Sequence, residues 1–565
     1  MKTKERLIVI GNGMAGARFV EDLVARNGRD RFDITVFGDE PYGNYNRILL
    51  SNVVSGANEP KDIFLNPIEW YERNGITLHA GVRVTTVDRV NKVVSAANGI
   101  VEHYDHLVFA TGSKPFVPPI EGLRDENGRF RDGIFLFRTL DDSLRIIDYA
   151  AKARKAVVLG GGLLGLEAAR GLLNRGLEVH VVELMAYPMA VQLDPAAGAI
   201  LRATLEKLGI RFHLGHSVTA VSGSTSVESV TVREAQARQR EASIDAGHNE
   251  SCDMFVISAG IRPNVEIAKD AGLTVERAIV VGDDLACVND PSVFAIGECA
   301  QHRGQVYGLV TPCREQAKIL ATRLSGADPR AAYVGSNTST TLKVMGVDLT
   351  VLGNKEPADE KDGAVTYSDP QRGIYKKVIL REDRVAGAIL LGDTGIANTL
   401  LRAFHKREVI SQSPQELLFP VAAPHESPVS LESPEEVIDE PLKEVIAVIR
   451  PETWIKTRSR VEELGIETFT QHRVVGRGRQ RGLHFLARRG ATSKTGFRYL
   501  PKRMASWIVP ASQVQALVEA IIDANWTGQI GDGKIFVLPL DGTVQIGTGE
   551  RNGLLQSEDP ALTNA

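Results

Sequence analysis

The sequence contains few cysteines and no long apolar run. Its 565 residues include four cysteines, and no two of them have CxxC spacing: Cys252, Cys287, Cys299 and Cys313. This argues against a disulfide framework, a zinc site or an iron–sulfur cluster. No apolar stretch approaches the ~18 uninterrupted residues of a membrane helix. The first residues lead directly into an apolar strand, without the pattern of a signal peptide. We therefore expect a cytoplasmic protein that does not contact a membrane.

The charge is unevenly distributed, although the net charge is only −4. Residues 426–444 hold seven acidic side chains, whereas residues 473–503 hold ten Lys or Arg and no acid. A basic tract usually lies on a solvated face or contacts phosphates. Nucleic-acid binding is one explanation of this tract, but no interleaved aromatic residues support stacking on bases. We expect no nucleic-acid partner.

Two glycine-rich turns, each placed between an apolar strand and a helix, are the most informative features. The glycines of the first turn are Gly11, Gly13 and Gly16, and those of the second are Gly160, Gly162 and Gly165. In such a turn the first glycine permits the bend, the second admits a pyrophosphate, and the third lets the helix pack on the strand. The phosphate then sits at the positive end of the helix. Two such turns predict two dinucleotides, a hydride donor beside a flavin.

Acidic residues close the strand that follows each turn. They are Asp39 and Glu40 after the first and Glu183 after the second, where a carboxylate can bind ribose hydroxyls. The Glu183 carboxylate suits a free 2′-hydroxyl and repels a 2′-phosphate, because like charges placed together cost several kcal/mol. We therefore expect NADH to be preferred over NADPH by roughly a hundredfold.

The order of these patterns predicts the domain organisation. Residues 1–112 and 251–330 are expected to form the FAD-binding domain, with an NAD(P)H-binding domain of residues 113–250 inserted into it. A third domain, residues 331–420, has short β-rich runs. Residues 421–440 are rich in Pro, Ser and Glu, as is typical of a linker. Residues 441–555 begin a fresh strand and have their own core.

Residues 1–420 resemble the N-terminal flavin half of the large subunit of NAD(P)H-dependent assimilatory nitrite reductases, within the pyridine nucleotide-disulfide oxidoreductase-like flavoproteins. The matching stretches are residues 11–16, 44–51, 110–112, 160–167, 297–299, 308–310 and 392–394. The resemblance implies an α/β two-dinucleotide-binding fold, doubly wound, with an α+β C-terminal reductase domain.

The resemblance also implies roles for individual residues. FAD would lie on the first turn, with Asp39 and Glu40 at its ribose, Arg47 at its phosphates, and the stretch Ala110, Thr111 and Gly112 beside it. Glu298 stands at the ribityl chain, where relatives commonly carry Asp, and a helix opening near Pro312 would point its positive end at the flavin. NADH would bind the second turn. Glu167 would lie near nicotinamide and flavin, in a positioning role.

No thiol stands where disulfide reductases of this type carry their redox cysteines, because Leu50, Ser51 and Asn52 occupy that place. The resemblance then implies that electrons leave FAD directly for a separate acceptor protein. No cysteine quartet for a sirohaem or iron–sulfur site follows. We therefore expect that this chain alone does not reduce nitrite.

Residues 441–555 resemble PII nitrogen-regulatory proteins. The matching stretches are residues 446–451, 476–482, 500–502, 527–536 and 548–550. The resemblance implies an α+β ferredoxin-like domain that assembles as a homotrimer, or a multiple of three, with ATP or ADP, Mg²⁺ and 2-oxoglutarate as regulatory ligands. Backbone N–H groups of a glycine-rich loop and a lysine suit phosphates. The expected ligand residues are Gly478, Gln480 (also the Mg²⁺ ligand), Lys502, Gly531, Asp532, Gly533 and Lys534.

The second resemblance has two departures. Gln545 and Gly547 stand where the family has two arginines. Whether this domain binds the triphosphate of ATP is therefore an open question of the sequence. The usual modified tyrosine is missing, and Thr492 and Ser493 are the possible replacements in the basic loop.

These observations together predict an NADH-dependent FAD oxidoreductase in nitrate or nitrite assimilation, regulated by a fused PII-type sensor. One alternative is a PII-type signalling protein whose flavoprotein part senses redox state. A second alternative is a rubredoxin or ferredoxin reductase.

Overall fold

The structure is a computed structural model that divides into two compact units, Met1–Pro424 and His425–Ala565. The first unit is described for residues 4–235, 247–336, 339–359, 361–410 and 414–419. The second unit is described for residues 441–466, 468–476, 500–526, 533–540, 542–544 and 551–553. The predicted linker, residues 421–440, lies outside the described residues. None of the helices described in these ranges is both long and apolar enough to cross a membrane.

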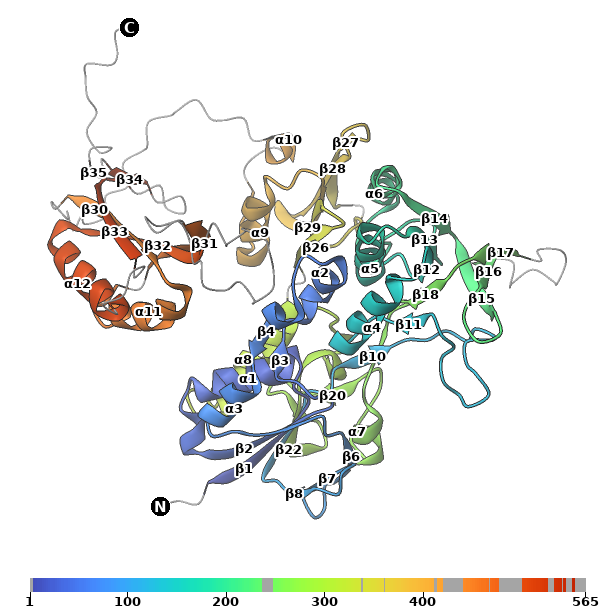
Figure 1. Ribbon diagram of the computed structural model, residues 1–565, viewed down its shortest axis with the longest axis horizontal. Helices are drawn as coiled ribbons and strands as arrows, with labels where there is room; N and C mark the ends of the chain where they lie inside the picture. The colour runs from blue at the N-terminus through green and yellow to red at the C-terminus, as the bar shows by residue number, and fades with distance from the viewer. Residues whose placement is uncertain are drawn as a thin grey trace, which may run out of the picture. The chain divides into compact units, whose positions relative to one another are not determined.

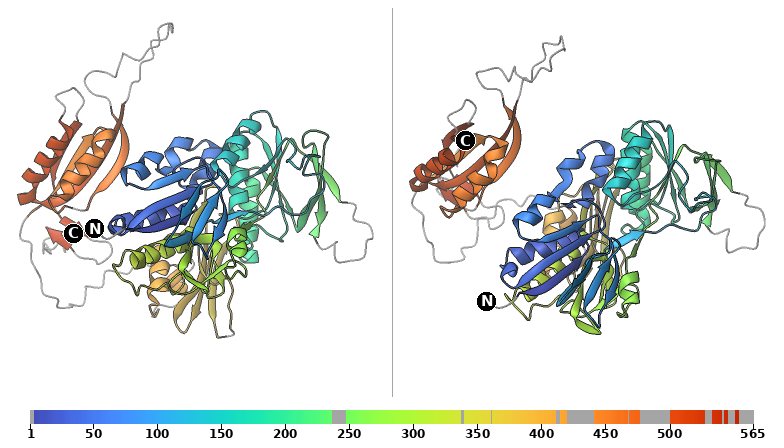
Figure 2. Two further views of the ribbon diagram at one scale, coloured as in Figure 1. Left: turned by 90° about the horizontal axis from the view of Figure 1, so that it is seen from below. Right: turned by 60° about the horizontal axis from the view of Figure 1, so that its bottom comes forward.

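A nine-stranded sheet forms the centre of the expected FAD-binding domain, and its order is β24-β23-β20-β21-β22-β9-β1-β2-β5. Its strands are β1 (Glu5–Ile10), β2 (Phe32–Gly38), β5 (Thr77–Ala80), β9 (His106–Phe109), β20 (Ile279–Val281), β21 (Ala286–Cys287), β22 (Asp290–Ala295), β23 (Ala300–His302) and β24 (Gln305–Val306). Helices α1 (Met14–Val24) and α8 (Val310–Leu324) pack against each other beside it. The N-terminal and C-terminal parts of this domain therefore lie side by side, blue and lime in Figure 2.

The inserted domain is built on a parallel sheet of order β11-β18-β12-β13-β14. Its strands are β11 (Ile134–Leu136), β12 (Lys155–Leu159), β13 (Glu178–Glu183), β14 (Ile210–Leu214) and β18 (Met254–Ile257), with helices α4 (Leu140–Ala150), α5 (Leu163–Asn174) and α6 (Pro195–Lys207). A second sheet joins β15 (His216–Ser222), β16 (Ser229–Glu234) and β17 (His248–Ser251). These elements form the teal and green part of Figure 1.

The boundary expected after residue 250 needs a correction. Strand β18 follows that boundary, yet it pairs with β12 and β11 of the nucleotide sheet. The chain returns to the first domain through β19 (Ile261–Pro263), which pairs antiparallel with the outgoing β10 (Ser113–Pro115). The apolar residues of β18 suit a central strand of either sheet, so only the pairing decides its place.

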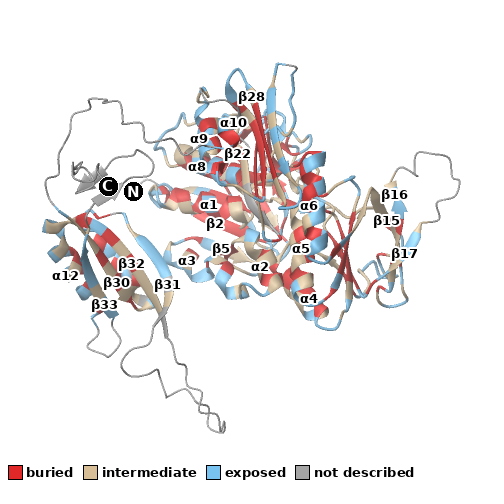
Figure 3. Cartoon of the chain, turned by 90° about the horizontal axis from the view of Figure 1, so that it is seen from above, coloured by how far each residue is buried: buried red, intermediate tan, exposed pale blue. Residues whose placement is uncertain are grey.

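Smaller elements complete the first domain and shape its cavity. They are β3 (Asn44–Tyr45), β4 (Phe64–Asn66), β6 (Val84–Asp88), β7 (Val93–Ala96), β8 (Val101–His103), α2 (Leu50–Ser55), α3 (Ile68–Arg73) and α7 (Glu266–Asp270). Figure 3 shows buried residues concentrated along the strands and on the inner sides of the helices that cover them.

The third domain is a five-stranded antiparallel sheet of order β25-β26-β29-β28-β27. Its elements are β25 (Ser339–Val344), β26 (Val347–Gly353), β27 (Gly363–Asp369), β28 (Ile374–Arg381), β29 (Arg384–Leu391), α9 (Ala397–Lys406) and α10 (Pro414–Leu418). The residues of its core include Val378, Leu390 and Leu400. Buried Asp194 at the start of α6 accepts hydrogen bonds from Tyr375 and Lys377, which ties this domain to the nucleotide domain.

The second unit has the double βαβ order of a ferredoxin-like domain, as the sequence predicted. Its elements are β30 (Leu442–Ile449), α11 (Trp454–Glu462), β31 (Thr470–Gly476), β32 (Leu500–Pro510), α12 (Val514–Asn525), β33 (Gly533–Pro539), β34 (Gly542–Val544) and β35 (Arg551–Gly553). The main sheet has the antiparallel order β31-β32-β30-β33. Trp507 and Leu517 are fully buried between this sheet and its helices.

Candidate functional site

The two glycine turns have the same backbone geometry. Gly11 has a φ of +116° and Gly160 a φ of +115°, and side chains there would also strike a carbonyl oxygen of the neighbouring strand. A Cβ on Gly16 would lie 2.0 Å from the Gly11 oxygen, and one on Gly165 would lie 2.0 Å from the Gly160 oxygen. These glycines therefore allow each helix to begin directly on its strand, which the sequence motif predicts.

The middle glycine of each turn faces open space. A Cβ on Gly13 or Gly162 would meet no atom within 4 Å among the described residues. Both glycines are N-cap residues, of α1 and α5 respectively, and neither helix receives a side-chain cap. Each turn thus leaves backbone N–H groups at a positive helix end available for a phosphate.

One cavity of about 1130 Å³ extends from the first turn to the helix of the second. Its walls include the predicted residues Gly11, Gly13, Asp39, Glu40, Arg47, Ala110, Thr111, Gly112, Glu167 and Glu298. Leu163 and Leu164, which open α5, also line it. A cavity of this size exceeds the volume usual for a drug-sized ligand and suits a dinucleotide with space for a second ring system.

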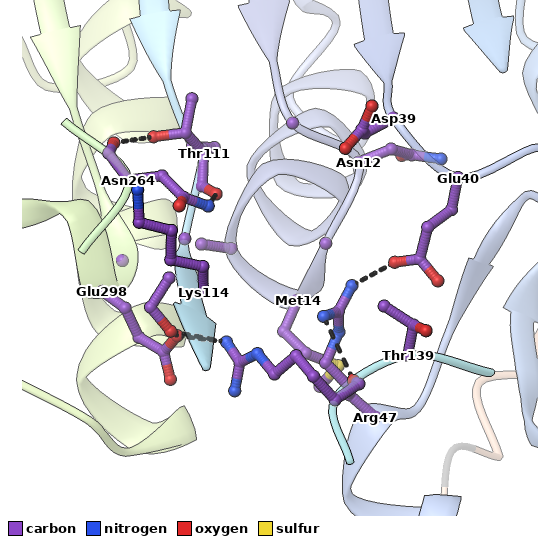
Figure 4. Close-up of a pocket in the computed structure, with 18 of the residues that line it drawn as sticks. Asn12, Met14, Asp39, Glu40, Arg47, Thr111, Lys114, Thr139, Asn264 and Glu298 are labelled. Atoms are coloured by element: carbon purple, nitrogen blue, oxygen red, sulfur yellow. Dashed lines mark hydrogen bonds and ion pairs between the residues drawn. The ribbon is translucent and has the colours of Figure 1, made fainter. Parts of the chain in front are cut away.

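The two predicted ribose carboxylates are held by arginines at one end of the cavity. Glu40 forms an ion pair with Arg47 (Figure 4). It also accepts a 2.6 Å hydrogen bond from the hydroxyl of Tyr45. Asp39 forms an ion pair with Arg83. Arg47 thus pairs with one of the predicted ribose carboxylates and lines the cavity, and its phosphate role stays a prediction.

The opposite wall is fixed by two reciprocal hydrogen bonds. The Thr111 hydroxyl donates to the Asn264 carbonyl at 2.8 Å, and the Asn264 side-chain amide donates to the Thr111 carbonyl at 2.8 Å (Figure 4). Beside them Lys114 pairs with Glu266 on α7. Asn264 and Lys114 join this wall through tertiary contacts, and no local pattern singled them out.

Glu298 lies in a polar cluster that the sequence did not predict. Its carboxylate accepts a 2.5 Å hydrogen bond from the hydroxyl of Ser113 and forms a 2.5 Å ion pair with Arg138. Arg138 lies 160 residues before Glu298, so no spacing rule could have joined them. The buried Nε of Arg138 has no hydrogen-bond partner within the described ranges, and neither has the side-chain nitrogen of Asn12. Unpaired buried donors beside a cavity indicate a polar ligand, and the donor set fits FAD.

Glu167 contacts Ser51, one of the residues expected at the place of the redox cysteines. Burial raises the pKa of the Glu167 carboxyl to about 7, and a hydrogen bond with Ser51 opposes that rise. The group therefore exchanges its proton near neutral pH, at the end of the cavity formed by α5. Its positioning role stays a prediction.

The side chain of Glu183 is hydrogen-bonded to backbone N–H groups beside the second glycine turn. Its Oε2 accepts a 2.5 Å hydrogen bond from the N–H of Gly161, and its Oε1 accepts a 2.8 Å bond from the N–H of Met185. The carboxylate is thus fixed at the end of β13 beside the turn. It retains free lone pairs for ribose hydroxyls.

Cys313 lines the cavity, but it is protonated. Burial raises the pKa of its thiol to about 12, and the thiol donates to the carbonyl oxygen of Leu309 at 3.2 Å. The helix α8 begins at Val310, close to the predicted opening near Pro312, and its first residues line the cavity. The positive end of α8 therefore faces the cavity, whereas the neutral thiol does not offer a nucleophile.

The described ligand residues of the second unit meet at one end of its sheet. Gly533 pairs with Ile449, and Lys534 pairs with Val448, at the end of β30. Lys502 lies on β32 beside Arg503, which pairs with the same Ile449. Gly533 has a φ of +132°, and a Cβ there would lie 2.3 Å from the Val448 oxygen. The other predicted residues, Gly478, Gln480, Gly531 and Asp532, lie outside the described residues.

Comparison with known proteins agrees with this geometry. Residues 5–317 match the family model of pyridine nucleotide-disulphide oxidoreductases. The chain belongs to this family. Residues 339–408 match the C-terminal domain of rubredoxin NAD+ reductases, and residues 442–550 match the nitrogen regulatory protein P-II. The predicted combination of domains and the two-dinucleotide fold are thereby confirmed, and family membership supports FAD and a pyridine nucleotide as the cofactors.

Curated relatives share the oxidoreductase part. The chain is 41% identical over 410 residues to a nitrite reductase [NAD(P)H] of Bacillus subtilis, covering 73% of this chain and 48% of the relative. It is 39% identical over 417 residues to the assimilatory nitrate reductase electron transfer subunit of the same organism, covering 74% and 51%. The chain thus spans about half the length of these relatives.

Solved structures share the fold of this oxidoreductase. A ferredoxin reductase from Rhodopseudomonas palustris is similar with a TM-score of 0.60 and 25% identity, covering 69% of this chain and 91% of that one. NADH:rubredoxin oxidoreductase from Clostridium acetobutylicum has a TM-score of 0.57 and 23% identity, covering 74% and 100%.

Proposed function

We propose that this oxidoreductase uses NADH to reduce bound FAD and passes the electrons to a separate acceptor protein. The observation that carries the proposal is the single cavity whose walls include both the first glycine turn and Glu167 of the second turn's helix. Two dinucleotides bound at these turns would bring their reactive rings together in one space. FAD supplies the redox chemistry, and the protein supplies binding, orientation and charge.

Individual residues take the following roles in this proposal. The N–H groups around Gly13 and the side chain of Arg47 hold the pyrophosphate, and Glu40 binds the ribose. Arg138 and Glu298 hold the polar chain of FAD, and the positive end of α8 stabilises negative charge at the flavin. The second turn binds the pyrophosphate of NADH in the same manner, with Glu183 at the ribose.

The acceptor is proposed to be a component of nitrate or nitrite assimilation. Support comes from the named relatives, a nitrite reductase and an assimilatory nitrate reductase electron transfer subunit. A small redox protein is the second candidate, since residues 339–408 match the C-terminal domain of rubredoxin NAD+ reductases. In both cases electrons leave FAD without a thiol intermediate, because Ser51 stands at the position of the redox cysteine.

The second unit is proposed to regulate this transfer as a PII-type sensor. ATP or ADP with Mg²⁺, and 2-oxoglutarate, would bind at the end of β30, where Lys502 and Lys534 lie. The expected assembly is a homotrimer, with ligands between subunits. Covalent fusion keeps sensor and oxidoreductase at a high local concentration, so even a weak contact between them can regulate turnover.

Steady-state assays of the purified full chain test the proposal. The protein should contain about one FAD and should oxidise NADH with ferricyanide or with the native acceptor. Fast turnover supports an enzyme. The alternative of a signalling protein with a redox-sensing part predicts flavin reduction without rapid turnover to any acceptor.

A further inference from the structure

A cluster of histidines and one glutamate joins the two sheets of the nucleotide domain, away from the glycine turn. His180 on β13 and His213 on β14 belong to the parallel sheet, and Glu250 on β17 belongs to the three-stranded sheet. Figure 1 shows β13 and β14 in teal and β17 in green. His180 is buried, and His213 and Glu250 are largely covered. None of the three lines the cavity described above.

Three potential ligand atoms face one another at nearly equal distances. His180 Nδ1 lies 3.1 Å from His213 Nε2 and 3.4 Å from Glu250 Oε2, and His213 Nε2 lies 3.3 Å from the same oxygen. In a tetrahedral zinc site with bonds near 2.0–2.1 Å, neighbouring ligand atoms are about 3.3 Å apart. The triangle therefore has the dimensions of one face of such a site.

The outer contacts leave ligand lone pairs directed at this triangle. His180 Nε2 donates to Glu178 Oε1 at 2.8 Å, so the opposite nitrogen, Nδ1, is the free acceptor. Lys155 donates to Glu250 Oε1 at 2.5 Å, which leaves Oε2 facing the imidazoles. A carboxylate behind a histidine and a cation behind a carboxylate are contacts that orient metal ligands.

Without a cation this arrangement is not fully satisfied. The bare Nδ1 of His180 and the carboxylate oxygen of Glu250 are both acceptors, and His213 Nε2 carries at most one hydrogen for the two. A divalent cation would satisfy all three atoms at once.

We propose that His180, His213 and Glu250 bind a divalent transition metal of the zinc class. His248, whose Nε2 lies 3.9 Å from Glu250 Oε2 and whose side chain is half exposed, is within reach as the fourth ligand. Imidazole and carboxylate ligands in a tetrahedral arrangement favour Zn²⁺. Among the residues that the structure describes, this is the only cluster of three such groups. The cysteine spacing argued against a zinc site, but histidines brought together by strand pairing have no fixed spacing.

The bound metal would fasten β17 to the parallel sheet that carries Glu183. Because β13 contributes both His180 and, at its end, Glu183, the metal would act on the rigidity of the nucleotide domain. It would not take part in electron transfer, since its ligands do not line the cavity. Metal binding to the folded state alone raises the melting temperature in proportion to the logarithm of metal concentration.

Zinc binding by the full-length protein tests the proposal. After dialysis against a chelator, titration with ZnCl₂ should yield one more zinc per chain in the unmutated protein than in His213→Gln or Glu250→Gln. The melting temperature of the unmutated protein should rise by several degrees with zinc. The matched control is His103→Gln on the exposed strand β8, which should bind zinc as the unmutated protein does.

Cobalt(II) provides a test that needs no variant. The unmutated protein should give the intense visible absorption of tetrahedral Co²⁺, and one equivalent of Zn²⁺ should abolish it. The proposal is overturned if zinc content and affinity are the same in the unmutated protein and both variants. It is equally overturned if Co²⁺ shows only the weak absorption of its aqueous ion. Circular dichroism checks that the variants are folded. If a variant is unfolded, the cobalt spectrum of the unmutated protein decides whether the proposal holds.

Discussion

The carboxylate of Glu183 accepts a hydrogen bond from the N–H of Gly161, 22 residues before it, in the middle of the second glycine turn. The residue that would recognise the ribose is therefore fixed against the loop that would hold the pyrophosphate. A negative charge held at this place cannot move away from a 2′-phosphate.

Nucleotide preference is expected to depend on Glu183. The unmutated protein should use NADH roughly a hundredfold better than NADPH in kcat/KM, and Glu183→Ala should remove most of that difference because the repulsion is lost. Glu183→Arg should reverse it. Steady-state rates with both nucleotides measure the ratio, and Glu206→Gln on the exposed face of α6 is the control. Equal rates with both nucleotides in the unmutated protein would contradict the assignment.

The rate of FAD reduction should depend on pH through Glu167. Its pKa is raised to about 7, so the group is neutral below this pH and ionised above it. An ionised Glu167 at the cavity wall repels the negative charge that the cofactor gains on reduction. This repulsion should raise the activation free energy by about 1 kcal/mol, which slows reduction about fivefold. Rapid mixing with NADH should therefore record a fall of this size as pH rises through 7, and Glu167→Gln should abolish it. Ser51→Ala should move the step to higher pH, because a hydrogen bond to the ionised form is lost.

The same shift has a consequence for stability. The pKa of Glu167 in the folded state, about 7, lies above its ordinary value of 4.5. The protonated carboxyl therefore stabilises the folded state fully below about pH 4.5, and this stabilisation is lost as the pH rises from there to about 7. The melting temperature of Glu167→Gln, relative to the unmutated protein, should therefore increase between about pH 5 and about pH 8. A constant difference over this range would show that the carboxyl does not titrate there.

Electron transfer should not need a thiol. Cys313 lines the cavity, but burial raises the pKa of its thiol to about 12. Cys313→Ala removes the sulfur with little change in volume, so turnover with ferricyanide should stay within about twofold of the unmutated rate. Cys252→Ala, remote from the cavity, controls for loss of stability. A folded Cys313→Ala protein that binds FAD but transfers no electrons would disprove direct transfer.

Ligands of the sensor should change the rate of NADH oxidation in the intact chain. A coupling of ~1–3 kcal/mol changes activity about 5- to 150-fold if the docked state is inactive. We expect Mg-ATP with 2-oxoglutarate to relieve inhibition, and Lys534→Ala to lose the response because a phosphate ligand is removed. Lys456→Ala on α11 is the control. Calorimetric binding of these ligands without any change of rate would refute the coupling.

Assembly can be measured on the same protein. Light scattering of the full chain should give a mass three times that of the 61.4 kDa chain, or a multiple of three. A mass of a monomer or a dimer at working concentration would contradict the trimer that the resemblance to PII proteins implies.

Local sequence predicted those parts of the site that depend on neighbouring residues. The glycine turns, the acidic strand ends and the start of α8 were all located within a residue or two, because backbone geometry at a turn depends on which residues can adopt it. The third domain was expected to have short β-rich runs, and its five-stranded sheet agrees with that expectation.

Tertiary structure decided the partnerships between distant side chains. Arg138 meets Glu298, Ser51 meets Glu167, and His180 meets Glu250 because strand pairing and the inserted domain bring distant segments together. The position of β18 was likewise set by its hydrogen-bonded neighbours rather than by its composition. Sequence by itself determined which kinds of domain are combined, the glycine turns and the acids that follow them. Only the fold determined which charges face one another, because pairing energy depends on distance in space and not along the chain.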